Sequence, residues 1–600
     1  MNDFNSQLTA AQNEGKLTAT AVANIRAWLT EPRYAEYAAQ VAEHITQGKW
    51  KELDDAFWTV IPFGTGGRRG KMYPLGCNVI NDRTIGESAQ GLAEYVLEQN
   101  IPAEARTAAI AYDTRHNSRR FAELCASILV ANGFRVYMLD DYRSTPELSF
   151  LVRYKNCVCG IMVTASHNPP SDNAVKVYWA GGVQVVPPHD KGIIAKVMAA
   201  QTIKKVDFAT AVKEGKVILC RDEVDRAYQQ AVLTQRFPGP RDLKILYTPL
   251  HGVGESAVCP VLAADGFTDV EVYGPNREPN GDFPNVPGHV SNPENPPVFD
   301  APVLRAKEIG ADIVLATDPD CDRMGCSAPV MKDKNGEWRT LDGNQLGAML
   351  IDFVLEQRKK NGGLSKEHYV VSTLVTTQMG RRIADSYGVK TYNNLHVGFK
   401  WICSQIDIAG PDKFLFGTEE SHGFLAGTHA RDKDGPVACM LMSELAASVK
   451  ASGKTLHEKL ESLYWQHGYH GERLLNVTMT GSAGMARMKA LMALLRQSPP
   501  ESLGGLKVKA IRDYLNLTHT VIGKSAQPLA ADKSDMIILD LAEEGNYIAV
   551  RPSGTEPKVK FYMFTYVPAE QLHDLQATKQ EMTERLNAFE KDLRGLAEKV

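Results

Sequence analysis

The stretch TAAIAYDTRHNSRRFAELCASILVANGFRVYML, residues 107–139, contains the pattern that decides the fold. The apolar run Thr107–Thr114 predicts a buried strand, and Phe121–Gly133 predicts a helix that ends at a glycine. The next apolar run, Phe134–Leu139, predicts a second strand. Because a strand–helix–strand unit brings its two strands side by side in parallel, this stretch predicts an α/β layer with a covered sheet.

The same alternation recurs on both sides of this stretch. Further strands are expected at Cys157–Ala165, Lys244–Leu250, Thr268–Tyr273, Ala311–Thr317 and His368–Val375, with helices near Leu304–Ile309 and Arg381–Tyr387. The first sixty residues differ, because Ala35–Ile45 and Trp50–Trp58 show the three- and four-residue spacing of amphipathic helices. The apolar runs within residues 535–554 and 558–567 predict an antiparallel α+β region, with a helix near Met485–Leu495 and a charged helix up to Val600.

Boundaries near residues 228, 342 and 466 divide this pattern into four domains. Residues 1–228, 229–342 and 343–466 are predicted as three α/β domains with mixed or parallel sheets. Residues 467–600 are predicted as an α+β domain. The predicted fold class is therefore α/β, with a different C-terminal domain.

Composition excludes several classes of protein. The chain has 600 residues, of which 67 are basic and 71 acidic, so its net charge is −4. This balance gives no electrostatic reason to expect nucleic acid or an anionic membrane as a partner. The ten cysteines form no C-x-x-C pair, no apolar run reaches 18 residues, and the first residues show no apolar signal core. We therefore expect a cytoplasmic protein with reduced thiols.

The loop TASHNPP, residues 164–170, directly follows an apolar strand. Asn168-Pro169 forces a turn, and Ser166 lies on it. The loop is not the G-x-S-x-G nucleophile elbow of α/β-hydrolases, because that motif needs glycines where Thr164 and Asn168 stand. Taken alone, a plain turn explains it better. A serine at the carboxyl end of a strand, where α/β sheets place their sites, still leaves a functional role open.

The loop TDPDCDR, residues 317–323, also follows a strand. Its aspartates alternate, so Asp318, Asp320 and Asp322 can point to one side of an extended loop. Three carboxylates so close together need a cation, and an all-oxygen set suits Mg²⁺ better than zinc. An EF-hand calcium-binding loop would need glycine and glutamate where Arg323 and Pro329 stand. A metal site is therefore favoured over a solvated acidic turn.

Two further loops carry weaker signals. GTEESHG, residues 417–423, offers acceptors for sugar hydroxyls, although an acidic surface loop explains it better when it is taken alone. RPSGTEPKVK, residues 551–560, has the composition of a phosphate-binding loop, and a basic turn is an equal alternative. Together, a serine, a Mg²⁺ loop, a sugar loop and a phosphate loop in four successive predicted domains indicate phosphoryl transfer on a sugar.

These four motifs occur in the order and approximate spacing of the α-D-phosphohexomutase superfamily, which the chain resembles from about Pro62 to its C-terminus. The resemblance implies three α/β domains and one TBP-like α+β domain around a central cleft. By motif, Ser166 resembles the phosphoserine that donates and regains the phosphoryl group. Asp318, Asp320 and Asp322, with Ser166, resemble the ligands of one Mg²⁺ ion per chain.

The resemblance also implies roles for other residues of the site. Lys176 and Lys400 are similar to proton-transfer lysines, and His167 and Arg323 lie beside the serine and the metal loop. The implied substrate-binding residues are Arg69, Arg115, Glu419, Ser421, Arg551, Ser553, Gly554, Thr555 and Lys560.

The EES sequence at Glu419–Ser421 is typical of the family's glucose-preferring members. The implied activity is that of a phosphoglucomutase, which interconverts glucose 1-phosphate and glucose 6-phosphate through glucose 1,6-bisphosphate, itself an activator. The expected partners are small sugar phosphates, with the chain a monomer or a dimer. Thr418, His422 and Arg68 depart from the common pattern and leave phosphomannomutase and phosphopentomutase as alternatives. Two further alternatives are a sugar-bisphosphate synthase and a non-catalytic sugar-phosphate sensor. A simple phosphatase is disfavoured, because a bound bisphosphate must be shielded from water.

Overall fold

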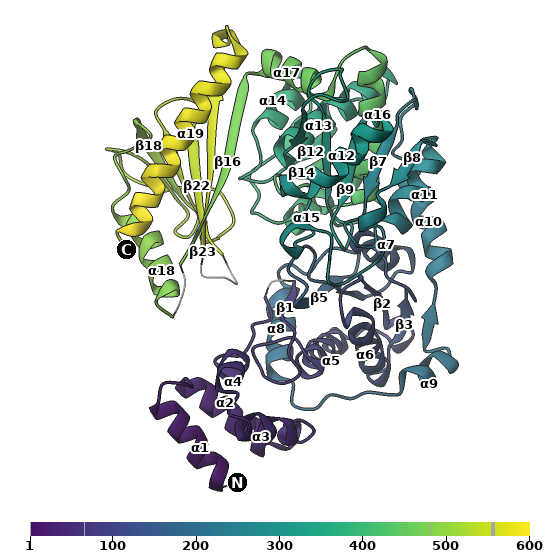
Figure 1. Ribbon diagram of the computed structural model, residues 1–600, viewed down its shortest axis with the longest axis vertical. Helices are drawn as coiled ribbons and strands as arrows, with labels where there is room; N and C mark the ends of the chain where they lie inside the picture. Colours follow the sequence, from purple (N-terminus) through teal and green to yellow (C-terminus); the bar gives the residue numbers. More distant parts are fainter. Residues whose placement is uncertain (1, 65, 480–481, 554–557) are drawn as a thin grey trace. The chain divides into compact units, whose positions relative to one another are not determined.

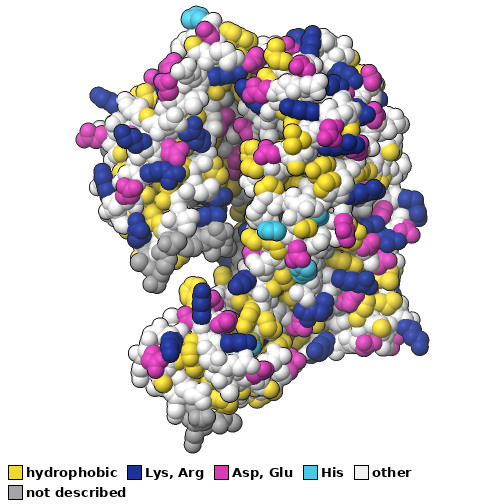
Figure 2. Space-filling view, viewed as in Figure 1, with side chains coloured by type: hydrophobic (Ala, Val, Ile, Leu, Met, Phe, Trp, Pro, Cys, Tyr) yellow, Lys and Arg dark blue, Asp and Glu magenta, His cyan; other side chains and the backbone are white. Residues whose placement is uncertain are grey.

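The computed structural model describes residues 2–64, 66–479, 482–553 and 558–600 (Figure 1). The chain forms two compact units, one of Met1–Ser327 with Gly423–Glu444 and one of Ala328–His422 with Leu445–Val600. Within the described ranges, no helix combines the length and the apolarity needed to cross a membrane. Figure 2 shows basic and acidic side chains interspersed over the visible face, in keeping with the near-neutral net charge.

The N-terminal helices of the first unit have a core of their own. Trp28 is almost fully buried there, with its ring stacked 4.6 Å from Tyr34 and edge-on to Phe57. The helices predicted at residues 35–45 and 50–58 are confirmed, and two more precede them. The four helices are α1 (Asn2–Asn13), α2 (Ala19–Thr30), α3 (Ala38–Thr46) and α4 (Trp50–Phe57).

A six-stranded mixed sheet follows, with the order β1-β5-β4-β2-β3-β6. The strand β2 is parallel to β3 and β4, whereas β5 is antiparallel to β4 and β1. Its strands are β1 (Gly67–Lys71), β2 (Thr107–Tyr112), β3 (Arg135–Met138), β4 (Cys159–Val163), β5 (Asp172–Trp179) and β6 (Val217–Leu219). Its helices are α5 (Asp82–Glu98), α6 (Ser118–Ala131), α7 (Thr145–Tyr154), α8 (His189–Ala199), α9 (Phe208–Lys213) and α10 (Arg221–Leu233).

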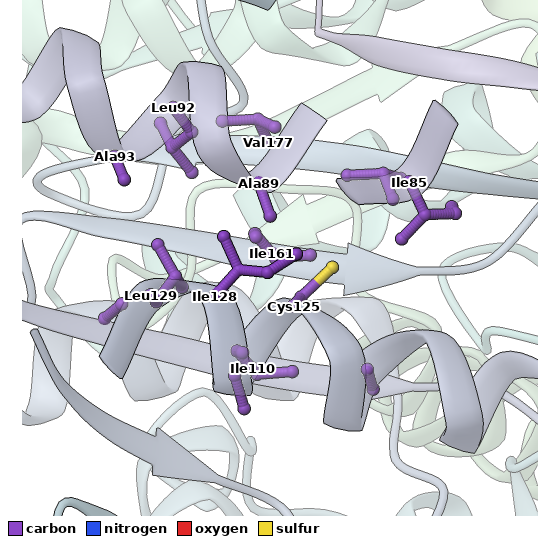
Figure 3. Close-up of a cluster of buried hydrophobic side chains, with 14 of the residues drawn as sticks. Ile85, Ala89, Leu92, Ala93, Ile110, Cys125, Ile128, Leu129, Ile161 and Val177 are labelled. Carbon is purple, nitrogen blue, oxygen red and sulfur yellow. The ribbon is translucent and has the colours of Figure 1, made fainter. Parts of the chain in front are cut away.

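Helices cover both faces of this sheet. Figure 3 shows Leu92 of α5 and Ile128 of α6 converging on Ile161 of β4, in one buried cluster. The neighbouring residue in β4, Gly160, points to the opposite face, because successive strand residues alternate. A Cβ atom at Gly160 would lie 2.6 Å from Cγ2 of Val152 in α7. The glycine therefore lets α7 pack closely on the second face.

The second sheet of this unit contains the strands that bracket the aspartate loop. In the order β10-β9-β7-β8, β7 is parallel to β8 and β9, and β10 is antiparallel to β9. Because Thr317 pairs with Met324, the residues between them form a short loop at the carboxyl end of β9. The elements are β7 (Ile245–Thr248), α11 (Glu255–Asp265), β8 (Val270–Val272), α12 (Asp300–Ile309), β9 (Ile313–Thr317), β10 (Met324–Pro329), β15 (Gly423–Ala426) and the start of α16 (Gly435–Ala451).

The second unit begins with another α/β region, in which β12 is parallel to both β13 and β14. Its elements are β11 (Trp338–Leu341), α13 (Gly343–Lys360), β12 (Tyr369–Val371), α14 (Met379–Ser386), β13 (Lys390–Tyr392), α15 (Phe399–Ala409), β14 (Phe414–Glu419) and α17 (Leu456–His467).

The C-terminal region is built on an antiparallel sheet, in the order β16-β23-β22-β21-β18-β19-β20. Leu491 of α18 and Phe589 of α19 are fully buried against Phe561 of β23. The predicted α+β character is thus confirmed, whereas the domain limits and the central cleft stay predictions. The elements are β16 (Tyr469–Thr478), α18 (Ser482–Gln497), β17 (Ser502–Leu503), β18 (Leu506–Asp513), β19 (Thr518–Val521), β20 (Gln527–Pro528), β21 (Ile537–Leu541), β22 (Tyr547–Pro552), β23 (Lys558–Val567) and α19 (Leu575–Glu598).

Candidate active site

Ser166 lies in a buried turn directly after β4. Its φ of 52° is left-handed, a conformation that non-glycine residues adopt rarely and that tends to occur at functional sites. Ser166 Oγ donates a hydrogen bond to Asp318 Oδ2 at 2.7 Å, and His167 Nδ1 lies 3.3 Å from the same Oγ. The serine and an aspartate 152 residues away in sequence therefore meet directly.

Arg115 holds the turn in shape. Its guanidinium donates to the carbonyl oxygens of Ser166 at 2.5 Å and Pro169 at 2.7 Å, and to that of Asn168. Asp113, at the end of β2, accepts from the Arg115 backbone N–H. Sequence reasoning did not single out Asp113, although a carboxylate at the carboxyl end of a buried strand is the signal that could have found it. Arg115 therefore holds the backbone of the Ser166 turn in place, and its contact with substrate stays a prediction.

We expect Arg115→Lys to lower kcat about tenfold to a hundredfold, because a lysine cannot reproduce the planar fork that fixes the Ser166 turn. Steady-state kinetics measure the effect, with the exposed Arg119→Lys on α6 as the matched control. A rise in KM with kcat unchanged would show instead that Arg115 acts mainly by binding substrate.

The three aspartates of the 318–322 loop form a buried cluster with one carboxylate oxygen from each within 4.8 Å of the others. Asp318 Oδ1 accepts the backbone N–H groups of Asp322 and Arg323, each at 3.1 Å. Among the described residues, Asp320 Oδ1 and Asp322 Oδ1 have no hydrogen-bond donor. Buried carboxylate oxygens without donors are unusual unless a cation binds them. The cluster therefore fits a hard divalent cation such as Mg²⁺.

Two lysines balance part of this charge. Lys176 Nζ, on β5, lies 2.7 Å from Asp320 Oδ2, and Lys433 Nζ lies 2.8 Å from Asp322 Oδ2. Burial alone would raise the pKa of Asp320, but the Lys176 ammonium outweighs it and holds that pKa well below its usual range. Burial likewise favours a lower pKa for Lys176, yet Asp320 and Asp322 raise it. The two aspartates therefore favour the charged form of Lys176.

Sequence reasoning missed Lys433, and the structure shows how the chain positions it. Its neighbours Asp432 and Asp434 accept hydrogen bonds from Tyr178 Oη at 2.6 Å and Tyr228 Oη at 2.9 Å. With both flanking residues anchored, Lys433 is directed at Asp322. The only local signal is the charge alternation in RDKD, residues 431–434, which a solvated turn would also show.

The other predicted residues of this unit lie nearby. Burial, together with the positive charges of Arg323 and Arg69, holds the pKa of His167 well below its usual value, so its ring is neutral. Arg323 Nε lies 3.8 Å from Asp322, and its guanidinium pairs with Glu294. Arg69 is an exposed residue of β1, which pairs with the strand that carries Lys176.

In the second unit, the predicted sugar loop packs against the start of α13. Glu419 ends β14 and is buried, Ser421 is partly buried, and His422 has a left-handed φ of 62°. A Cβ atom at Gly343 would lie 2.1 Å from the carbonyl oxygen of Glu420. The glycine thus allows the loop to approach the helix N-terminus closely.

The predicted phosphate loop of this unit is described in part. Arg551 and Ser553 line a cavity of about 440 Å³, while Gly554 and Thr555 lie outside the described residues. Lys560, on β23, is paired in register with Arg551. Lys400 lies in the first turn of α15, with its ammonium 5.4 Å from the Trp401 ring.

Three family models match successive parts of the chain. Those described as "Phosphoglucomutase/phosphomannomutase, alpha/beta/alpha" domains I, II and III match residues 61–204, 226–330 and 342–467, together more than half of the chain.

Curated relatives and solved structures agree with these matches. A phosphoglucomutase of Staphylococcus haemolyticus is 34% identical over 85% of this chain and 91% of its own, and one of Staphylococcus aureus is 33% identical over 86% and 92%. The open form of parafusin, a Paramecium phosphoglucomutase, superposes with a TM-score of 0.62 at 17% identity, covering 90% of this chain and 97% of its own. A phosphoglucomutase/phosphomannomutase family protein from Burkholderia thailandensis gives 0.61 at 17% identity, covering 89% and 97%. Both structures show the likeness of fold.

With its three α/β domains and C-terminal β-rich domain, and with relatives that match over most of both chains, the chain belongs to the phosphoglucomutase/phosphomannomutase family of phosphohexomutases, which are intramolecular phosphotransferases.

Proposed function

We propose that this enzyme interconverts glucose 1-phosphate and glucose 6-phosphate through a phosphorylated Ser166 and a glucose 1,6-bisphosphate intermediate. The observation that carries the proposal is the 2.7 Å hydrogen bond from Ser166 Oγ to Asp318 within the buried aspartate cluster. This hydrogen bond places a hydroxyl that can carry a phosphate directly beside a site that can bind a cation. The EES loop and the phosphoglucomutases named among the relatives support the choice of glucose.

A serine hydroxyl is a weak nucleophile, and a serine that starts as its phosphate ester avoids this difficulty. In the first half of the cycle, a sugar hydroxyl attacks the phosphorus, the bond from phosphorus to Ser166 Oγ breaks, and the hydroxyl proton passes to a base. The bisphosphate then reorients, Ser166 Oγ attacks the other phosphorus, the bond from that phosphorus to the sugar oxygen breaks, and the freed sugar oxygen takes up a proton. Lys176, Lys433 and Arg323 would stabilise the charge on the transferring group. Mg²⁺ held by the three aspartates would supply further charge neutralisation.

The remaining residues are proposed to bind and orient the sugar phosphate. Glu419 and Ser421 would contact sugar hydroxyls, and Lys400 together with Lys176 would move protons. The loop that holds the non-reacting phosphate would comprise Arg551, Ser553, Gly554 and Thr555, with Lys560 nearby; Arg69, Arg115 and His167 would line the approach to Ser166. A cytoplasmic location is proposed as well, since all ten cysteines are free thiols.

Phosphorus NMR of the purified enzyme with Mg²⁺ and a trace of glucose 1,6-bisphosphate tests the proposal. Starting from glucose 1-phosphate, we expect glucose 6-phosphate to accumulate, with kcat/KM higher than for mannose 1-phosphate or ribose 1-phosphate. A preference for either of the other sugars would make the enzyme a phosphomannomutase or a phosphopentomutase. No interconversion of any of the three would contradict the proposal.

A further inference from the structure

The 440 Å³ cavity of the second unit is lined by two separate parts of the chain. The C-terminal region contributes Arg551 and Ser553, and the segment between β13 and α15 contributes His396 and Val397. Because a water molecule occupies about 30 Å³ in the liquid, the cavity has room for a phosphate group and part of a sugar ring.

The charged side chains that line this cavity favour an anion. Lys489 and Lys533 line it together with Arg551. The acidic side chain among the described lining residues, Asp535, is already paired with Arg496. The balance of charge in the cavity is therefore positive.

His396 stands out within this lining because it is buried without using its polar atoms. The residue is 9% exposed, and neither ring nitrogen has a hydrogen-bond partner within the described parts of the chain. Buried polar groups are normally hydrogen-bonded, so two unpartnered nitrogens beside a cavity indicate that a ligand supplies the partners.

Aromatic contacts fix the orientation of the His396 ring. It meets the Trp401 ring nearly edge-on, with centroids 5.5 Å apart, and the buried Tyr514 ring at 6.3 Å. These contacts hold the imidazole without occupying its nitrogens, so little side-chain freedom is lost when a ligand binds.

The surroundings of His396 favour the neutral form of its ring. Burial lowers its pKa, the charge and the backbone of Asp532 oppose this shift, and the charge of Arg551 reinforces it. A neutral imidazole has one N–H donor and one acceptor nitrogen. It is therefore suited to a ligand that presents an acceptor beside a donor, as a phosphate oxygen next to a sugar hydroxyl does.

We infer that His396 is a substrate-binding residue, which donates its ring N–H to the non-reacting phosphate held by Arg551 and Ser553 and accepts from a neighbouring sugar hydroxyl. The inference rests on the proposed function and extends it. It also predicts that His396 helps to retain the bisphosphate, because that intermediate must reorient without leaving the enzyme.

Two substitutions at this position test the inference. His396→Phe keeps an aromatic ring against Trp401 and Tyr514 but removes both nitrogens, whereas His396→Gln keeps a donor and an acceptor. We expect the phenylalanine variant to raise KM for glucose 1-phosphate about tenfold to a hundredfold, the range for one hydrogen bond to a charged group. It should also release more free glucose 1,6-bisphosphate per turnover. The glutamine variant should recover most of both losses.

His519→Phe on β19 is the matched control, since it removes a histidine of the same unit that does not line the cavity, and it is expected to change neither quantity. Titration of each protein with inorganic phosphate by calorimetry gives a second readout, which does not depend on catalysis. His396→Phe should weaken phosphate binding about tenfold or more.

The two proposals can fail separately. If the wild-type enzyme interconverts the glucose phosphates but His396→Phe matches it in KM, bisphosphate release and phosphate affinity, the inference is overturned and the proposed function stands. If the wild-type enzyme interconverts no sugar phosphate, the proposed function fails. The phosphate titrations then decide on His396 by themselves, because equal affinity in wild type and His396→Phe overturns the inference and weaker binding in the variant supports it.

Discussion

Replacing Ser166 by alanine is expected to reduce kcat/KM for glucose 1-phosphate by at least about a thousandfold, because the phosphoryl group would lose its point of attachment. The hydroxyl is the only part of the turn that the substitution removes. The Arg115 hydrogen bonds go to backbone carbonyl oxygens, including that of Ser166, and these remain. A folded and inactive variant is therefore expected.

Mass spectrometry of intact protein and of its peptides measures the chemical step directly. Wild-type enzyme incubated with glucose 1,6-bisphosphate should carry one phosphate on the peptide that contains Ser166, and unlabelled glucose 1-phosphate should remove it. Ser171→Ala, at an exposed serine of the same loop, is the control and should retain both charging and turnover. Phosphate transfer to sugar by the Ser166→Ala variant would rule out the proposed phosphoserine.

The substitution Asp322→Asn should cost at least about a hundredfold in kcat/KM and should weaken Mg²⁺ binding by a similar factor. Asn keeps the shape of the side chain but removes the charge of a carboxylate whose Oδ1 has no donor among the described residues. Calorimetric titration with Mg²⁺ gives the affinity, and activity before and after chelation gives its consequence. The exposed Asp269→Asn is the matched control.

The loss expected in activity and Mg²⁺ affinity is not expected in the stability of the metal-free protein. Burial and the neighbouring Asp320 raise the pKa of Asp322, so its charged form is disfavoured in the fold. Metal-free Asp322→Asn is therefore expected to melt no lower than metal-free wild type, while Mg²⁺ should raise the Tm of wild type more than that of the variant. A variant that binds Mg²⁺ as tightly as wild type would show that Asp322 is not a ligand.

Much of the fold could be predicted from the sequence because it depends on local patterns. The strand expected at Thr107–Thr114 is β2, and the helix expected at Phe121–Gly133 is α6, each within a few residues. Apolar periodicity and the positions of glycines reflect only one or two helical turns or a few strand residues. They therefore predict helices and strands without knowledge of the rest of the chain. Two helices before residue 35 were not assigned individually, and their packing around Trp28 became visible only in the structure.

The residues most clearly anticipated in the site lie at strand ends. Ser166 follows β4, and the aspartates at 318, 320 and 322 follow β9, where the two-residue spacing places their carboxylates together. Their roles stay predictions, but their placement follows from the sequence, because a strand end and a spacing are local properties.

The partners of these residues were decided by the tertiary structure alone. Ser166 meets Asp318 across 152 residues of sequence, and Lys176 meets Asp320 across 144. Lys433 reaches Asp322 from a segment whose flanking residues are anchored to tyrosines of other elements. Sequence by itself determined which residue types stand at the ends of which strands. Only the packed structure decided which charges meet, because ion pairs and hydrogen bonds depend on distances in space that no local pattern encodes.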